Sequence, residues 1–195
     1  MRRFATYLTL GLGLLVVALI SGCRAAPPPA PPAPEFRPTA TVREVMGNMV
    51  DPSADVLWES VATIVSEKGI DDRRPRTDEE WAAVKRSAVT LVEATNLLLI
   101  DRPTGRTEDI SANPNIELSP AEIDAVRKKD PEAWKGFVKG LYDSAVPALN
   151  AINAKDADAL LNSGEGIDVA CENCHLHYWY PPNKTPPSIP SQKGS

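Results

Sequence analysis

Four stretches of this 195-residue chain contain few Gly or Pro residues and repeat their apolar residues in steps of three and four. That spacing places apolar side chains on one face of an α-helix, which turns once every ~3.6 residues. The stretches cover residues 42–65, 77–100, 131–152 and 156–177. No stretch shows the sustained alternation of apolar and polar residues that marks a half-buried strand. The sequence therefore predicts an all-α fold, an antiparallel four-helix bundle.

Local signals predict where several of these helices begin. Thr77–Glu80 and Ser119–Glu122 fit capping boxes, in which a hydroxyl and a carboxylate each accept a bond from a free backbone N–H. Asp130-Pro131 starts another helix. Asp51-Pro52 interrupts the first stretch, so we expect a short helix and then a kink, or a restart with Asp51 as N-cap. The long loop over residues 101–118 is expected to hide a turn of helix or to lie over the domain.

The beginning of the chain has the pattern of an export signal over residues 1–22. A positive start precedes an apolar run that ends at Ile20, and this run is shorter than the ~20 residues of a membrane-spanning helix. Ile20-Ser21-Gly22-Cys23 resembles the bacterial lipobox, which implies lipid on the Cys23 sulfur and cleavage before it. An ordinary secretory signal is the alternative. The implied location is the periplasmic side, lipid-anchored to a membrane. The residue after the lipidated cysteine is Arg24 rather than Asp, and the sorting rule known for some diderm bacteria then favours the outer membrane.

Composition divides the rest of the chain into a linker, one domain and a tail. Residues 23–40 carry the predicted lipidated Cys and an Ala/Pro-rich linker, and residues 181–195 predict a disordered tail. The domain between them, residues 41–180, contains 25 Asp and Glu against 15 Lys and Arg, a net charge of −10. This charge argues against a nucleic-acid partner. It suits basic-surfaced protein partners, but a well-solvated surface is the default explanation.

The three cysteines divide into one near the start and two in a motif. If Cys23 carries lipid, the other two both belong to Cys171-Glu172-Asn173-Cys174-His175. Cys-x-x-Cys-His is the attachment signature of c-type haem. Residues three apart lie on one helix face, so both thiols can reach one porphyrin edge and form thioethers with its vinyl groups. His175 can then coordinate the iron from the proximal side. The motif predicts one covalent haem c.

Other interpretations of the motif are a disulfide, a redox dithiol or half of a zinc site. A structural zinc site needs four protein ligands, and His177 is the one further histidine. A thioredoxin-like dithiol belongs beside a βαβ pattern, which the sequence lacks. His177 lies about 200° around the helix from His175, so we expect it to be an exposed or capping residue. Gly164 and Gly166 weaken this helix by about 1 kcal/mol each, or leave room for a flat ligand.

A helical bundle with this motif near the end of its last helix resembles the class II c-type cytochromes, which comprise cytochrome c prime and its low-spin relatives. The resemblance covers residues 41–180. The low-spin relatives use a methionine near the start of helix 1 as sixth iron ligand, commonly after an Arg, and Arg43-Glu44-Val45-Met46 resembles that arrangement. Met49 and an open sixth position are the alternatives, and methionines also commonly fill cores. A lipid anchor, the loop over residues 101–118 and the aromatic cluster Tyr178-Trp179-Tyr180 set this chain apart.

These observations predict an electron-transfer protein. A thioether opposite an imidazole stabilises ferrous iron and raises its potential. We expect no enzymatic activity, because the sequence has no acid–base constellation. A five-coordinate haem protein that binds NO or CO, as cytochrome c prime does, is the main alternative. A small peroxidase-like enzyme and a lipoprotein without haem are the others. The expected partners are redox proteins, and a homodimer is one possibility.

Overall fold

The computed structural model describes residues 37–184, and this part of the chain is mostly helical, as predicted. The predicted signal, Cys23 and the tail over 185–195 lie outside the described residues, as does the linker up to residue 36. The elements are α2 (Val42–Val45), the π-helical turn η1 (Met46–Val50), α3 (Asp51–Ser60), β1 (Thr63–Ser66), β2 (Gly69–Asp72), α4 (Asp78–Leu98), α5 (Pro120–Lys129), α6 (Pro131–Ala154) and α7 (Ala157–Tyr178). Within residues 37–184, no helix has the length and apolar character needed to span a bilayer.

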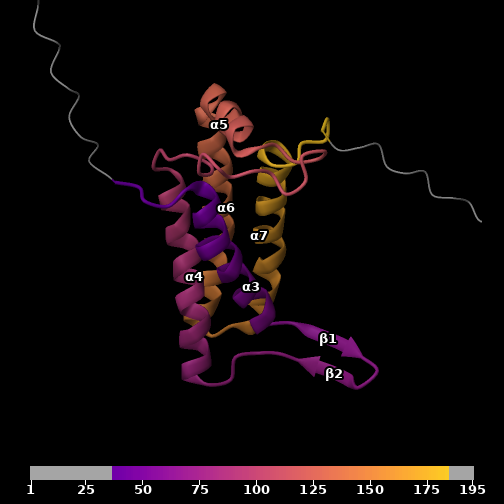
Figure 1. Ribbon diagram of the computed structural model, residues 1–195. Helices are drawn as coiled ribbons and strands as arrows, with labels where there is room; N and C mark the ends of the chain where they lie inside the picture. Colours follow the sequence, from indigo (N-terminus) through magenta and orange to yellow (C-terminus); the bar gives the residue numbers. More distant parts are fainter. Residues whose placement is uncertain (1–36, 185–195) are drawn as a thin grey trace, which may run out of the picture. The chain divides into compact units, whose positions relative to one another are not determined.

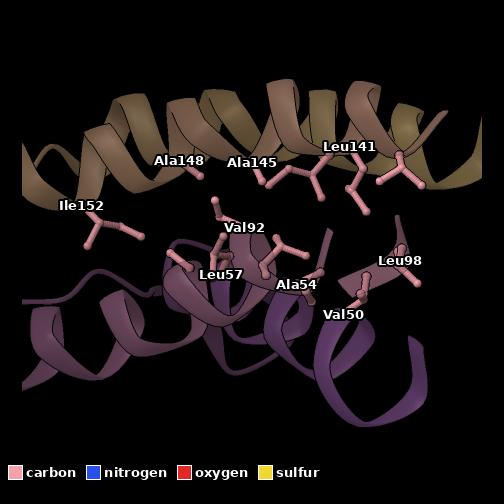
Figure 2. Packing of buried hydrophobic residues seen from close by; sticks show 14 of the residues in the cluster. Val50, Ala54, Leu57, Val92, Leu98, Leu141, Ala145, Ala148 and Ile152 are labelled. Carbon is pink, nitrogen blue, oxygen red and sulfur yellow. The ribbon is translucent and has the colours of Figure 1, made fainter. Parts of the chain in front are cut away.

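The long helices enclose one hydrophobic core. α6 packs along both α4 and α7, while α3 packs against α4 and α7. Figure 2 shows side chains from these elements meeting between the ribbons, among them Leu57 of α3, Val92 of α4 and Ala145 of α6. Leu91, Ala94, Ala148 and Ile167 reach zero exposure. Such close packing of apolar side chains is the main favourable contribution to folding.

The start of α2 and the end of α7 lie at the same end of the domain, with the loop between α4 and α5 crossing over them (Figure 1). The loop is tied to both elements. Val42 N–H donates to Pro103 O at 3.0 Å, and Leu118 N–H donates to Trp179 O at 2.7 Å. The prediction that this loop lies over the domain is therefore confirmed. The loop brings the first helical turn and the Cys-x-x-Cys-His motif to one end of the molecule.

The first helix differs from its prediction. Asp51 is not an N-cap, because it has helical dihedral angles and its N–H donates to Met46 O across the π turn. The chain thus passes from α2 through η1 into α3 without a restart. The buried positions are Val42 and Val45, followed after a step of five by Val50, whereas an α-helical face repeats in steps of three and four. The extra residue of the π turn absorbs that mismatch.

The first helix also ends at Ser60, where the prediction extended it to residue 65. The residues that follow form an antiparallel hairpin of β1 and β2, in which Val65 pairs with Ile70. The domain stays mostly helical and compatible with the all-α prediction, whereas the prediction of a helix up to residue 65 is wrong. β-branched residues at 63–65 favour strand over helix, and Gly69 adopts φ 120°, which favours glycine. Every residue of both strands is exposed, so the hairpin projects away from the core (Figure 1).

The remaining helix starts agree with their local signals. Thr77 and Ser119 close complete capping boxes with Glu80 and Glu122. A third box, which the sequence analysis did not identify, joins Thr41 to Glu44 at the start of α2. Asp130 caps α6 through a bond from Ala133 N–H. These boxes satisfy backbone donors that a helix start otherwise leaves free.

Candidate functional site

The Cys-x-x-Cys-His motif occupies the last turns of α7. Asp156 caps the start of this helix by accepting from Ala159 N–H at 2.9 Å, and the helix continues unbroken to Tyr178. Cys171 and Cys174 are free thiols, half-buried and packed against the core. A helix carries residues three apart on one side. The structure therefore brings both thiols together as predicted, without joining them in a disulfide.

Both thiols lie in surroundings that keep them protonated. Burial raises the pKa of Cys171 to about 11, and the carboxylates of Asp168 and Asp51 add to this effect. Burial, followed by the neighbouring Cys171, raises the pKa of Cys174 to about 12. Redox-active dithiols have a lowered pKa, because the thiolate is their nucleophile. This environment is thus the opposite of the one that a redox dithiol needs.

The His175 side chain is half-buried, and the rings of the aromatic residues that follow α7 pack against it. Burial lowers the pKa of His175, although the carboxylates of Glu172 and Asp51 oppose the shift. The Trp179 ring meets the imidazole edge to face at 5.1 Å between centroids, and the Tyr180 ring lies at 5.9 Å. Tyr180 Oη donates to Glu172 Oε2 at 2.7 Å. The neutral imidazole, the form that ligates metal, is thereby favoured and held in position.

Met46 and Met49 lie on η1, at the same end of the domain as the motif (Figure 1). Both side chains are half-buried and pack against the core. Asp51, the residue after η1, is close enough for its charge to raise the pKa values of Cys171 and His175. The end of η1 and the motif on α7 therefore approach one another, as the antiparallel arrangement predicts.

His177 points to another side of α7. It is exposed and contacts the rings of Phe137 and Tyr178, at 5.1 and 4.6 Å between centroids. His177 lines a groove of about 540 Å³ between α6 and α7. His175 instead contacts the ring of Trp179, which follows the motif. The expectation that the two histidines face different ways is confirmed.

Two buried residues lie near Cys174, and of these Arg127 was not identified from the sequence, whereas Tyr178 belongs to the aromatic cluster noted there. Arg127 stacks its guanidinium on Trp134 at 4.3 Å from the ring centroid, and Tyr178 packs edge to face against the same ring. Charge on Arg127 influences the pKa of Cys174. Arg127 Nε and Tyr178 Oη are both buried without a hydrogen-bond partner among the described residues. A buried polar atom without a partner is costly, so these two groups retain capacity for a further bond.

The side chains around the motif bear on two other interpretations, a zinc site and a flat ligand against Gly164 or Gly166. Across residues 37–184, no three His, Cys, Asp or Glu side chains converge in a group able to hold a metal ion, whereas a structural zinc site needs four ligands.

The flat group against Gly164 is the Trp58 indole. A Cβ at this glycine would lie 3.1 Å from Trp58 Cδ1, and Trp58 Nε1 donates to Gly164 O at 3.2 Å. At Gly166 the nearest side chain is Ser144, 3.9 Å from such a Cβ.

Comparison with protein-family models, with curated proteins and with solved structures finds no match for this chain.

Proposed function

We propose that this chain is an exported, lipid-anchored c-type cytochrome that carries one covalent haem and transfers electrons. The observation that carries the proposal is the common position of Cys171, Cys174 and His175 on the end of α7, next to the Asp51 end of the first helix. Two half-buried thiols and a half-buried neutral imidazole form the donor set that a covalent haem requires. The mutual packing of α3, α4, α6 and α7 is compatible with the four-helix bundle of the class II cytochromes.

Each residue has a defined task in this proposal. Cys171 and Cys174 hold the porphyrin edge as thioethers, and His175 is the proximal iron ligand. Met46 is the proposed sixth ligand, with Met49 as the alternative. The bound haem supplies a one-electron ferric–ferrous couple. The protein holds the imidazole between Trp179 and Tyr180 and limits access of water to it.

The surroundings of the motif also fit a bound organic group. Arg127 Nε and Tyr178 Oη are buried donors without a partner, and both residues lie near Cys174. Acidic or polar groups on a cofactor would satisfy such donors. The high pKa values of the two thiols argue for stable, unreactive sulfur and against thiol redox chemistry.

The test is expression in a bacterial strain competent in cytochrome maturation. Protein denatured in detergent should keep its haem on a gel, and its mass should include one haem. Cys171→Ser and Cys174→Ser should each sharply reduce the yield of haem-bearing protein. Asn173→Ser, a change at an exposed position of the same motif, is the matched control and should keep it. Colourless wild-type protein from such a strain would contradict the proposal.

A gas-binding haem protein is the second candidate. The observation in its favour is that Val45 and Val50 fill the buried positions of the first helix, while both methionines are only half-buried. An aliphatic side chain facing the iron would leave the sixth position open. Rapid CO binding by the reduced wild-type protein, together with a high-spin spectrum, would favour this candidate over electron transfer.

A further inference from the structure

An apolar groove of about 420 Å³ runs between α3 and α7. Leu57, Trp58 and Val61 line it from α3 and its end, and Leu160, Leu161 and Ile167 line it from α7. Leu161 is 46% exposed and Trp58 is half-buried, and these two side chains face solvent above a buried floor of Leu57, Val61, Leu160 and Ile167. Large apolar side chains of this kind, rimmed by polar residues, are typical of protein-binding surfaces.

The two helices that flank the groove are rich in carboxylates, and their basic side chains are His175 and His177 at the end of α7. Neither α3 nor α7 contains a Lys or an Arg, whereas α4, α5 and α6 each carry both signs of charge. Their carboxylates are Asp51, Asp55 and Glu59 on α3, and Asp158, Glu165, Asp168 and Glu172 on α7. Glu165 and Asp168 line the groove directly. The charged side chains that line the groove are therefore both acidic.

Most of these carboxylates lack a counter-ion among residues 37–184, as do Glu79, Glu93 and Asp101 elsewhere in the domain. Asp158 pairs with Arg74 at 2.5 Å. The other six form no ion pair within residues 37–184. Elsewhere, Glu44 pairs with Arg106 at 2.6 Å and Asp78 with Lys155 at 2.5 Å. Unpaired like charges repel one another and weaken the folded state, so a partner that brings positive charge to Glu165 and Asp168 would relieve repulsion at the groove.

The groove lies along the same side of α7 as the candidate site. Gly164, Asp168, Cys171 and His175 follow one another in steps of four, three and four, which is one helix face. Gly164 and Asp168 line the groove, and Cys171 and His175 continue the face toward the end of the helix. A protein seated in the groove would thus lie beside the proposed haem.

We infer that the α3/α7 groove is the docking surface for a basic protein, whose apolar side chain enters the groove while its Lys and Arg residues meet the acidic rim. An apolar centre with a charged rim is the usual organisation of a transient interface, and opposite charge speeds the encounter. That the partner exchanges electrons rests on the proposed function. The docking surface itself rests only on the groove and the charges.

The experiment uses the mature protein in detergent micelles and mitochondrial cytochrome c as a basic redox probe. Calorimetric titration at low ionic strength compares two triple variants. Glu165→Gln and Asp168→Asn at the groove, together with Asp55→Asn on the flanking helix α3, remove three negative charges and should raise Kd about tenfold, since exposed pairs contribute modestly and sum. Glu79→Gln, Glu93→Gln and Asp101→Asn remove the same net charge at exposed positions elsewhere, and should leave Kd within about twofold.

Two further measurements separate the apolar centre from the charges. Leu161→Ser should raise Kd about threefold without changing its salt dependence, because it removes apolar contact and no charge. Succinylation of the probe's lysines reverses their charge, and the modified probe should not bind. Circular dichroism checks that each variant is folded.

The outcomes distinguish this inference from the proposed function. Equal losses in both triple variants, or no binding of the basic probe to wild type, overturn the docking surface even if the protein carries haem. If the protein is colourless but binds the probe with the expected variant effects, the proposed function is wrong and the docking surface is supported.

Discussion

At the scale of single residues, the candidate site depends on side chains whose burial sets their chemistry. Cys171 and Cys174 remain protonated because burial raises their pKa values, and His175 remains neutral because burial lowers its own. One physical effect thus acts on acid and base in opposite directions, since desolvation always disfavours the charged form. Substitutions at single residues identify the side chain opposite His175 at the proposed iron.

Paired alanine substitutions identify that side chain. If Met46 is the sixth ligand, Met46→Ala should abolish the weak ferric methionine–iron absorption band and allow rapid CO binding, because it opens the sixth position. Met49→Ala is the matched control, since it lies on the same turn and is equally half-buried. Visible spectra of the oxidised, reduced and CO-treated proteins measure both effects. The reverse pattern would assign the ligand to Met49, and no change in either variant would exclude both methionines.

The motif could be predicted from the sequence, whereas its surroundings could not. Cys171, Cys174 and His175 lie on one regular helix, so their spacing alone determines their relative positions. Arg127 comes to lie near Cys174 through the packing of α5, and its bonds join it to Thr104 and Arg102 in a distant loop. Nothing in local sequence encodes such long-range contacts. The buried donors without partners were therefore visible only in the folded structure.

At the scale of elements, the first helix shows where local patterns stop being sufficient. Val42, Val45, Met46, Met49 and Val50 are all apolar, so several helical faces could be drawn through them. The structure selects the valines as fully buried and inserts a π turn to align them. Such turns occur often at functional sites. The capping boxes at Thr77 and Ser119 were predicted correctly because they depend on a few neighbouring residues, whereas the choice of buried face depends on distant packing.

The function of the π turn can be tested at Gly47. Deletion of Gly47 would restore α-helical bonding and rotate α2 by about 100° relative to α3, moving Val42 and Val45 out of the core. We expect a loss of about 2 kcal/mol or more in the free energy of unfolding. Gly47→Ala is the control. It has no atom within 4 Å of its Cβ, so it should be neutral or stabilise by up to ~1 kcal/mol. Urea unfolding measures both, and a neutral deletion would show that the turn has no role in packing.

The sequence analysis did not predict the hairpin, because the apolar residues of this segment also fit the spacing of a helix. Val61, Ile64 and Val65 follow the spacing of the preceding helix. Their β-branched neighbours and Gly69 favour a hairpin, and these local preferences prevail where no core is present to bury a helix face. The prediction of a helix up to residue 65 is therefore wrong, whereas the domain as a whole remains compatible with an all-α fold.

At the scale of the whole molecule, the proposed lipid on Cys23 determines where the domain works. The predicted linker over residues 24–40 could reach roughly 50 Å if extended as polyproline II. Cys23→Ser should prevent lipid attachment and release the protein into the soluble fraction or leave its signal uncleaved. Membrane fractionation with intact-mass analysis is the measurement. Mature Cys23→Ser protein that partitions into membranes like wild type would contradict the anchor.

The acidic α3/α7 face makes a further prediction about the whole domain. Its six carboxylates without ion pairs repel one another, so neutralising three of them should stabilise the fold even as it weakens docking. Asp55→Asn, Glu165→Gln and Asp168→Asn together should raise Tm by about 1–3 °C at low ionic strength. The gain should disappear at high salt, where screening already removes the repulsion. Glu79→Gln, Glu93→Gln and Asp101→Asn should give no such gain, because these carboxylates do not lie on that face. Calorimetric melting at two salt concentrations is the measurement. An equal gain in both triple variants would show that net charge alone, rather than its concentration beside the groove, limits stability.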